Sequence, residues 1–162
     1  MIPGDFSEVE VVFSRDAIKT FDAYRQRHRW QREAGGQLFA RIRNNSWIVE
    51  KAAGPHRLAI RTRFGFVPYQ AAQQEEINHR HAKGLEFVGD WHTHPEDIPT
   101  PSAPDLKSIS NLVRESIHHL PGFLLCIVGR KPFPDGLWVS LHSPSGDVRM
   151  PIKRFEPESV VP

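Results

Sequence analysis

The amino-acid sequence predicts a layered α+β (α/β) domain in which a mixed β-sheet is flanked by helices. Valine-rich segments with strand-like alternation are interspersed with segments of helical periodicity, a mixture typical of such layers. The chain has 162 residues, which suits one domain better than two. No internal repeat or low-complexity block divides it. We therefore expect a single domain over residues 1–155 and a loose, proline-containing tail over residues 156–162.

The first half of the chain is predicted to form four strands and one helix. Residues 8–13 alternate and are rich in valine, which indicates a strand. Ser14 is a plausible N-cap, and the apolar residues that follow it recur at approximately helical spacing. Asn44-Asn45 predicts the turn of a hairpin. In order, the expected elements are strand Glu8–Phe13, helix Asp16–Gln31, and strands Gln37–Arg43, Trp47–Ala53 and Ile60–Val67.

The second half begins with a helix rich in Gln, Glu and His, which Gly84 ends. A buried strand then runs into His92, and a proline-rich loop follows it. The next helix is expected to bury one apolar face, made by Leu106, Ile109, Leu112, Val113 and Ile117. The expected elements are helix Tyr69–Ala82, strand Leu85–Trp91, loop Glu96–Pro104, helix Asp105–His118, and strands Phe123–Val128, Gly136–His142 and Asp147–Ile152.

Composition and charge exclude several classes of protein. The formal net charge is only +2, and acidic and basic residues are interleaved, whereas a nucleic-acid binder more often has a concentrated basic stripe. Arg61, Arg63 and Arg130–Lys131 are scattered exceptions that we interpret as solvated surface. No apolar stretch approaches the roughly 20 residues of a membrane span, and the N-terminus does not resemble a signal peptide. We expect a cytoplasmic protein that binds neither nucleic acid nor membrane.

The chain has a single cysteine, Cys126, inside the apolar run Phe123–Val128. One cysteine cannot form an internal disulfide, and its apolar neighbours predict a buried, inert thiol. It also excludes cysteine-rich zinc ribbons. A zinc deaminase is disfavoured because its pattern requires a Pro-Cys-x-x-Cys partner.

The most informative stretch contains His92, His94 and Asp105. Two histidines separated by one residue at the end of a strand point the same way, because strand side chains alternate with a period of two. A carboxylate at the start of a helix, after a rigid proline-rich loop, can return to the same point. Two imidazoles and one carboxylate, with a fourth position left to water, are the ligands of a catalytic zinc site. We therefore expect one Zn²⁺ ion per chain.

A metal-activated water still needs a group that takes its proton, and Glu33 is the best candidate. It lies at the beginning of a predicted strand, and Gly35-Gly36 lets the backbone turn or pack closely there.

Simpler explanations exist for each piece. A second pair, His79-Arg80-His81, lies in a predicted helix, where residues two apart diverge, so it indicates a polar helix face. Ser102-x-x-Asp105 also fits a helix capping box, and Glu33 alone would be an ordinary surface glutamate. The occurrence of all the pieces in order, with a strand leading into the histidines, favours the metal site.

The pattern resembles the JAMM motif of the MPN-plus (JAB domain) zinc metallopeptidases. The matching residues are Glu33-x-x-Gly36-x-Leu38, Val88-Gly89-x-Trp91, His92-Thr93-His94-Pro95, and Ser102-x-x-Asp105 after six intervening residues. The resemblance implies an MPN/JAB (cytidine-deaminase-like) fold, with His92, His94 and Asp105 as zinc ligands, Glu33 as general acid/base and Ser102 as an oxyanion stabiliser. Thr93 stands where the motif usually has serine, which we expect to matter little because that side chain faces away from the metal.

The same resemblance implies hydrolysis of a peptide or isopeptide bond after the C-terminal tail of a ubiquitin-like or conjugated protein. Residues 65–68 and 96–101 are candidates to line the groove for that tail. The chain is similar to stand-alone JAB isopeptidases of bacterial anti-phage (CBASS) operons, which accompany E1/E2-like proteins and free a nucleotidyltransferase from its targets. Two alternatives stay open. One is trimming of a sulfur-carrier precursor to expose Gly-Gly, and the other is a non-catalytic tail-binding module with a structural zinc.

Overall fold

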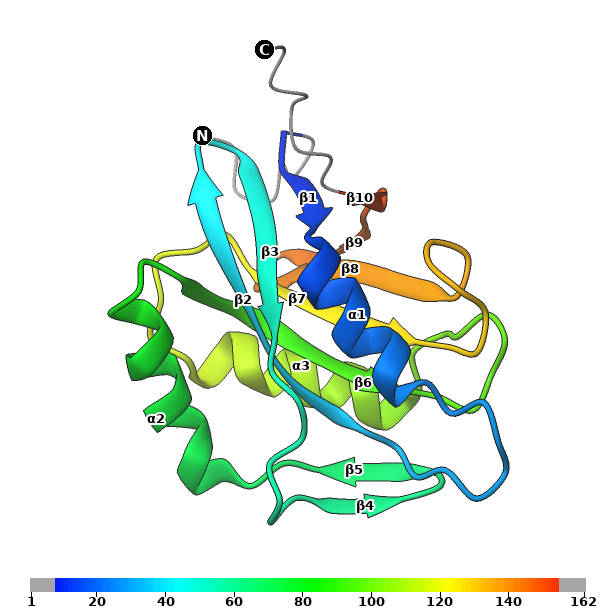
Figure 1. Ribbon diagram of the computed structural model, residues 1–162. Coiled ribbons are helices and arrows are strands. Elements are labelled where there is room, and N and C mark those ends of the chain that lie inside the picture. Colours follow the sequence, from blue (N-terminus) through cyan, green and yellow to red (C-terminus); the bar gives the residue numbers. More distant parts are fainter. Residues whose placement is uncertain (1–7, 155–162) are drawn as a thin grey trace, which may run out of the picture.

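The computed structural model describes residues 8–154, and an eight-stranded mixed sheet forms its centre (Figure 1). The strand order is β10-β1-β3-β2-β6-β7-β8-β9. Strand β1 is parallel to both of its neighbours and β6 is parallel to β7, whereas the other pairs are antiparallel. The strands are β1 Glu10–Phe13, β2 Gly35–Arg43, β3 Ser46–Ala52, β6 Glu86–Thr93, β7 Phe123–Val128, β8 Leu137–Ser143, β9 Gly146–Arg149 and β10 Lys153–Arg154. The predicted mixed sheet with flanking helices is confirmed.

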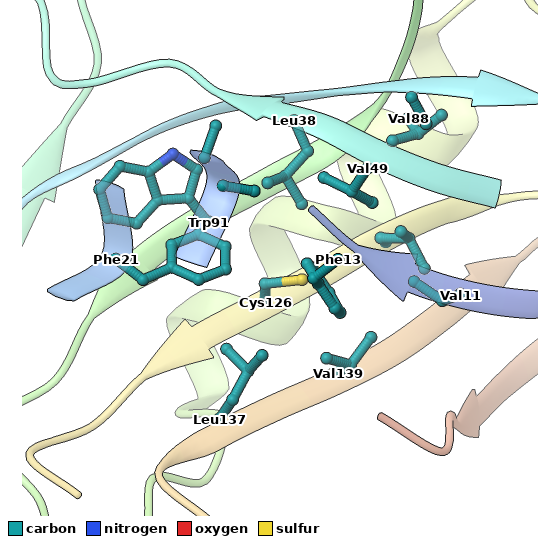
Figure 2. Close-up of a cluster of buried hydrophobic side chains, with 14 of the residues drawn as sticks. Val11, Phe13, Phe21, Leu38, Val49, Val88, Trp91, Cys126, Leu137 and Val139 are labelled. Atoms are coloured by element: carbon teal, nitrogen blue, oxygen red, sulfur yellow. The ribbon is translucent and has the colours of Figure 1, made fainter. Parts of the chain in front are cut away.

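Helices cover both faces of this sheet. The sheet therefore separates two hydrophobic layers, one under the helices of each face. Helix α1 (Arg15–Tyr24) packs on one face, where Phe21 lies 5.4 Å from Trp91 between ring centroids. Figure 2 shows this layer, with Cys126 beside Phe13 in the middle of the cluster. Helix α3 (Ala103–Glu115) packs on the opposite face, and helix α2 (Gln70–His81) contacts β6 near the edge of that layer. The predicted burial of Cys126 is confirmed, and burial raises the pKa of its thiol, so the group is inert.

The expected strand over Ile60–Val67 is wrong as a single element. The structure has a separate hairpin there, made of β4 (Ile60–Thr62) and β5 (Gly65–Val67). Arg63 and Phe64 form its turn, and the outer side chains are exposed. The alternation of side-chain types along the sequence continues through this short turn. The alternation alone therefore did not show that the chain reverses there.

The helix expected over Asp16–Gln31 is too long, since α1 ends at Tyr24. The helix ends there because the side chains of Arg25 and Gln26 are buried and form hydrogen bonds with other parts of the chain. The Arg25 guanidinium donates to the carbonyls of Gly129 and Lys131 at 2.8 and 2.6 Å. These tertiary hydrogen bonds outweigh the helix propensities of the residues that follow, which differ from one another by only a few tenths of a kcal/mol.

Two further boundaries differ from the expectation. Helix α3 begins at Ala103, because Ser102 is its N-cap, and it ends at Glu115. Only Ile109 and Val113 are fully buried on it, whereas Leu106 and Ile117 are exposed, so the predicted apolar face was too wide. The last expected strand, over 147–152, is too long, since β9 ends at Arg149, and the separate strand β10 begins at Lys153 at the opposite edge of the sheet. Pro151, which cannot donate to a ladder, lies between the two strands.

The expected loose tail over 156–162 lies outside the described residues. Across residues 8–154, no helix has the length and apolar character needed to cross a bilayer.

Candidate metal centre

Strand β6 presents two histidines from the face of the sheet that α3 covers. His92 lies on the strand and His94 follows its end, where the His94 N–H donates to the Val128 carbonyl at 3.0 Å. Their Nε2 atoms lie 3.1 Å apart. The alternation that the sequence predicted is therefore present, and Trp91 and Thr93 point to the opposite face.

Asp105 approaches both histidines from the first turn of α3. Its Oδ1 lies 3.0 Å from His92 Nε2, and its Oδ2 lies 3.1 Å from His94 Nε2. Oδ2 also accepts from the Ser102 backbone N–H at 2.8 Å, while Ser102 Oγ accepts from the Asp105 N–H at 3.2 Å. The capping box is thus real and serves the site, because it fixes the helix start that aims the carboxylate.

The three side chains fit a bound cation. One ligand atom from each of His92, His94 and Asp105 lies within 4.8 Å of the others. Nitrogen and oxygen ligands about 2.0–2.1 Å from a tetrahedral zinc ion lie roughly 3.3 Å from one another, close to the separations found here. Two imidazole nitrogens that face each other can share only one proton, whereas a cation satisfies both lone pairs and the carboxylate together.

Glu33 lies beside this cluster, with Oε1 3.8 Å from His94 Nε2 and only 5% of its surface exposed. The β4–β5 hairpin holds it from one side. The Glu33 N–H donates to Thr62 at 2.6 Å, and Arg61 Nε donates to the Glu33 carbonyl at 2.8 Å. The interpretation of Glu33 as a surface glutamate is therefore wrong.

The two glycines after Glu33 allow the close approach that the sequence suggested. A Cβ on Gly36 would lie 2.0 Å from the Ala53 carbonyl oxygen, and one on Gly35 would lie 2.6 Å from that of Trp91. Any larger residue would push β2, and Glu33 with it, away from the histidines.

Burial and neighbouring charges set the proton affinities of the site. Burial raises the pKa of Glu33 to about 7, with His94 opposing the shift and Asp105 adding to it. Burial would also raise the pKa of Asp105, but hydrogen bonds with His92 and His94 hold it well below the usual range. Burial lowers the pKa of His94, yet hydrogen bonds with Asp105 and Glu96 outweigh this, so the net shift is upward. Of Glu33 and Asp105, the two carboxyls beside the Nε2 atoms of the histidines, Glu33 is therefore the one that can both hold and release a proton near neutrality.

From the sequence, Glu96 was expected only to line the tail groove, and the structure also places its carboxylate against His94. Its Oε1 lies 2.9 Å from His94 Nδ1, on the side of the ring opposite the cluster. A carboxylate on the far nitrogen of a ligating histidine fixes the tautomer and orientation of the ring. The signal was present in the sequence as an acidic residue two positions after His94.

Thr93 has a second task that sequence spacing could not reveal. It faces away from the imidazoles, as expected, and is fully buried. Its Oγ1 accepts from the Ala34 N–H at 3.0 Å and donates to Gln26 Oε1 at 2.9 Å, while the Thr93 N–H donates to the Ala34 carbonyl. The hydroxyl thus ties the residue next to Glu33 to strand β6.

We expect Thr93→Val to destabilise the fold by about 1–3 kcal/mol, because the buried Ala34 N–H loses its partner. The displacement of Glu33 should also lower hydrolytic activity. Urea unfolding measures the first effect, and Thr93→Ser, which keeps the hydroxyl, is the matched control. Equal stability of Thr93→Val and Thr93→Ser would contradict the role of this hydrogen bond.

A cavity of about 600 Å³ opens over the cluster. One wall comes from the hairpin, through Phe64, Gly65, Phe66 and the following Pro68. Thus most of the expected groove segment 65–68 lines it, except Val67, which is exposed. Of the expected loop 96–101, Glu96 lines it. Asp105 and Ser102 also line it, together with Glu33 and both histidines.

Asp90 also lines this cavity, and within residues 8–154 its buried Oδ1 has no hydrogen-bond partner. Burial raises the pKa of this carboxyl to about 7. Because the pKa is higher in the folded than in the unfolded chain, the charged carboxylate destabilises the fold increasingly from about pH 4 to pH 7. We expect Asp90→Asn to be more stable than the wild type by about 1–3 kcal/mol at pH 8, with the two converging near pH 4. Urea unfolding of the zinc-free proteins at both pH values measures this, and a gap that is independent of pH would contradict it.

Comparisons with known proteins agree with this geometry. The chain matches the family of prokaryotic homologs of the JAB domain over residues 22–140. A protein named CD-NTase/cGAS isopeptidase from Vibrio cholerae is 35% identical over 133 residues, which cover 80% of this chain and 82% of the relative. A protein of the same name from Escherichia coli is 30% identical over 131 residues, covering 78% and 80%. The fold is similar to the solution structure of a protein from Desulfitobacterium hafniense, with a TM-score of 0.65, 18% identity, and 92% and 95% of the two chains covered.

Proposed function

Because this chain belongs to the prokaryotic JAB-domain family, we propose that it is a zinc-dependent isopeptidase that cleaves the bond after the C-terminal tail of a conjugated protein. The observation that carries the proposal is the convergence of Glu33, His92, His94 and Asp105, which come from three distant parts of the chain. A structural zinc site would close its fourth position with protein and would need no acid/base group. The buried Glu33 beside the ligands therefore favours catalysis over a tail-binding module.

The roles of the side chains follow from their positions. His92, His94 and Asp105 would hold a zinc ion, whose charge would lower the pKa of water toward neutrality and so supply the nucleophile. Glu33 would accept a proton and deliver it to the leaving amine. Ser102 uses an oxygen lone pair for the helix cap, so its O–H remains able to donate to the carbonyl oxygen of the scissile bond.

We propose that the substrate is a bacterial cGAS-like nucleotidyltransferase (CD-NTase) conjugated through its C-terminus, as part of anti-phage (CBASS) defence. The support comes from relatives named CD-NTase/cGAS isopeptidase that are 30–35% identical over about four fifths of this chain. E1/E2-like proteins would form the bond between the CD-NTase and its target, and this enzyme would cleave that bond. The extended tail would lie along the hairpin wall of the cavity, where main-chain hydrogen bonds to β5 give affinity.

The test uses a CD-NTase from the same genome, fused at its C-terminus to a fluorescent protein, with products identified by mass. We expect one cut directly after the natural C-terminus, abolished by a zinc chelator and restored by zinc. A sulfur-carrier precursor extended beyond Gly-Gly is the second arm. Cleavage of that precursor alone would replace the proposed substrate, and cleavage that persists in the chelator would overturn the metal mechanism.

A further inference from the structure

Two segments beside the metal centre carry basic residues and not one acidic residue. Residues 25–32 contain four arginines, and residues 51–74 contain three arginines and one lysine. Together they hold eight of the 21 basic residues, which leaves 13 to balance all 19 acidic residues in the rest of the chain. The small net charge of +2 therefore hides a strongly asymmetric distribution.

The fold brings parts of the two segments together, although the arginines are scattered in the sequence. Gln26 Nε2 donates to the Arg63 carbonyl at 2.8 Å, and the Arg63 guanidinium donates to the Arg29 carbonyl. In Figure 1 the loop that follows α1 passes beside the turn of the β4–β5 hairpin. Arg61 lies near Arg32, since burial and then the Arg32 charge lower the pKa of Arg61. We call this surface the arginine face; it consists of Arg27, Arg29, Trp30, Arg32, Arg61, Arg63 and Phe64.

The charge of the arginine face is not compensated within residues 8–154. None of its five arginines forms an ion pair with a carboxylate of that range, whereas Arg41, Arg80 and Arg130 elsewhere each do. Arg27, Arg29 and Arg32 are also solvent-exposed. Paired surface charges are largely neutralised, but an unpaired cluster creates a field that attracts an acidic partner.

Two large aromatic side chains project from the same surface. Trp30 is 77% exposed and Phe64 is 76% exposed. Trp30 stacks on His28 at 4.4 Å between ring centroids, and the Arg63 guanidinium lies 5.1 Å from the Phe64 ring. Tryptophan and arginine together dominate the binding energy of many protein interfaces, because each contributes a large contact area and a polar or charged group.

The arginine face continues directly into the active-site cavity. Phe64 belongs to the face and also lines the cavity, as Phe66 and Glu33 do. A folded protein whose tail lies in the cavity would therefore be held against the arginines. We propose that the arginine face docks an acidic surface of the protein whose tail is cleaved, so that the enzyme recognises a folded partner as well as a tail. This rests on the proposed function, and the shared boundary with the tail cavity favours a protein over a nucleic acid.

The experiment compares Arg29→Glu/Arg32→Glu with the wild type, using the CD-NTase–fluorescent protein fusion and a short fluorogenic peptide that carries only the tail. Arg15→Glu/Arg114→Glu, which reverses two exposed arginines elsewhere, is the matched control. We expect the face variant to raise KM for the fusion roughly tenfold with little change in kcat, because rim charges act mainly on encounter. Cleavage of the peptide should not change. High salt should raise KM of the wild type and of the control more than KM of the face variant.

A second arm measures binding of the uncut fusion to Glu33→Gln protein, with and without the face substitutions, by fluorescence anisotropy. If the wild type does not cut the fusion, the proposed function fails, and this binding still decides the docking proposal. Equal effects of the face and control variants would overturn docking, as would an equal loss of peptide cleavage. Two other results would overturn docking of a protein substrate. In either, the face substitutions would leave fusion binding intact, but would abolish binding of a single-stranded DNA oligonucleotide or would dissociate a dimer of this chain. Trp30→Ala, which keeps all charges, should weaken fusion binding without changing its salt dependence.

Discussion

Replacing Glu33 with Gln is expected to lower kcat for cleavage of the CD-NTase fusion by about 10²–10⁴-fold while zinc stays bound. The amide has nearly the same shape but cannot accept and return a proton. Zinc should remain because the three proposed ligands lie on other segments. Burial raises the pKa of Glu33 to about 7. The carboxyl can therefore accept and release a proton near neutral pH, as proton transfer to the leaving amine requires.

The measurements are single-turnover cleavage and the zinc content by atomic absorption. Glu75→Gln, an exposed glutamate on helix α2, serves as the control and should behave as the wild type. Retention of a tenth or more of the activity by Glu33→Gln, with zinc bound, would exclude Glu33 as the group that transfers the proton. Loss of zinc in this variant would instead place Glu33 among the ligands.

The second large effect is expected at Asp105, where two functions can be separated. Asp105→Asn keeps an oxygen that can accept from the Ser102 N–H, so the helix cap survives, but it removes the anionic ligand. We expect zinc affinity to fall by more than ~100-fold. Loss of a residue that only hydrogen-bonds to a metal ligand lowers metal affinity by about 10–100-fold, and loss of a ligand itself should have a larger effect. Cleavage should fall with the bound zinc.

Thermal unfolding with and without zinc measures this effect. A ligand at 100 times its Kd stabilises the native state by about 2.7 kcal/mol, and Asp105→Asn should lose this zinc-dependent gain. Ser102→Ala is the matched control, because it removes the cap hydroxyl at a cost of about 1 kcal/mol and leaves the zinc-dependent gain in place. A full zinc response in Asp105→Asn would show that Asp105 serves only the helix cap.

The ligand set could be read from local sequence because two of its members lie at the end of one strand. His92 lies on β6 and His94 directly follows its last residue, and extended backbone places residues two apart on one face regardless of the rest of the fold. The capping signature at Ser102 and Asp105 likewise marks a helix start from local residues alone. The order of strands and helices was also accessible, since binary patterning depends on neighbouring residues. Glu33 was a candidate for proton transfer because it precedes Gly35-Gly36 at the start of a predicted strand, and the resemblance then implied its role as general acid/base.

The sequence by itself therefore determined the layered class, the two histidines on one strand face and the capped helix that carries Asp105, because each depends on local periodicity or capping. Only the tertiary structure decided where helix α1 stops, that residues 60–67 form a hairpin, and how Thr93 and Gln26 hold the segment beside Glu33. It also decided that Arg29 and Arg63, 34 residues apart, share one surface. These features depend on hydrogen bonds and burial between distant segments, whose free energies exceed local propensities of a few tenths of a kcal/mol.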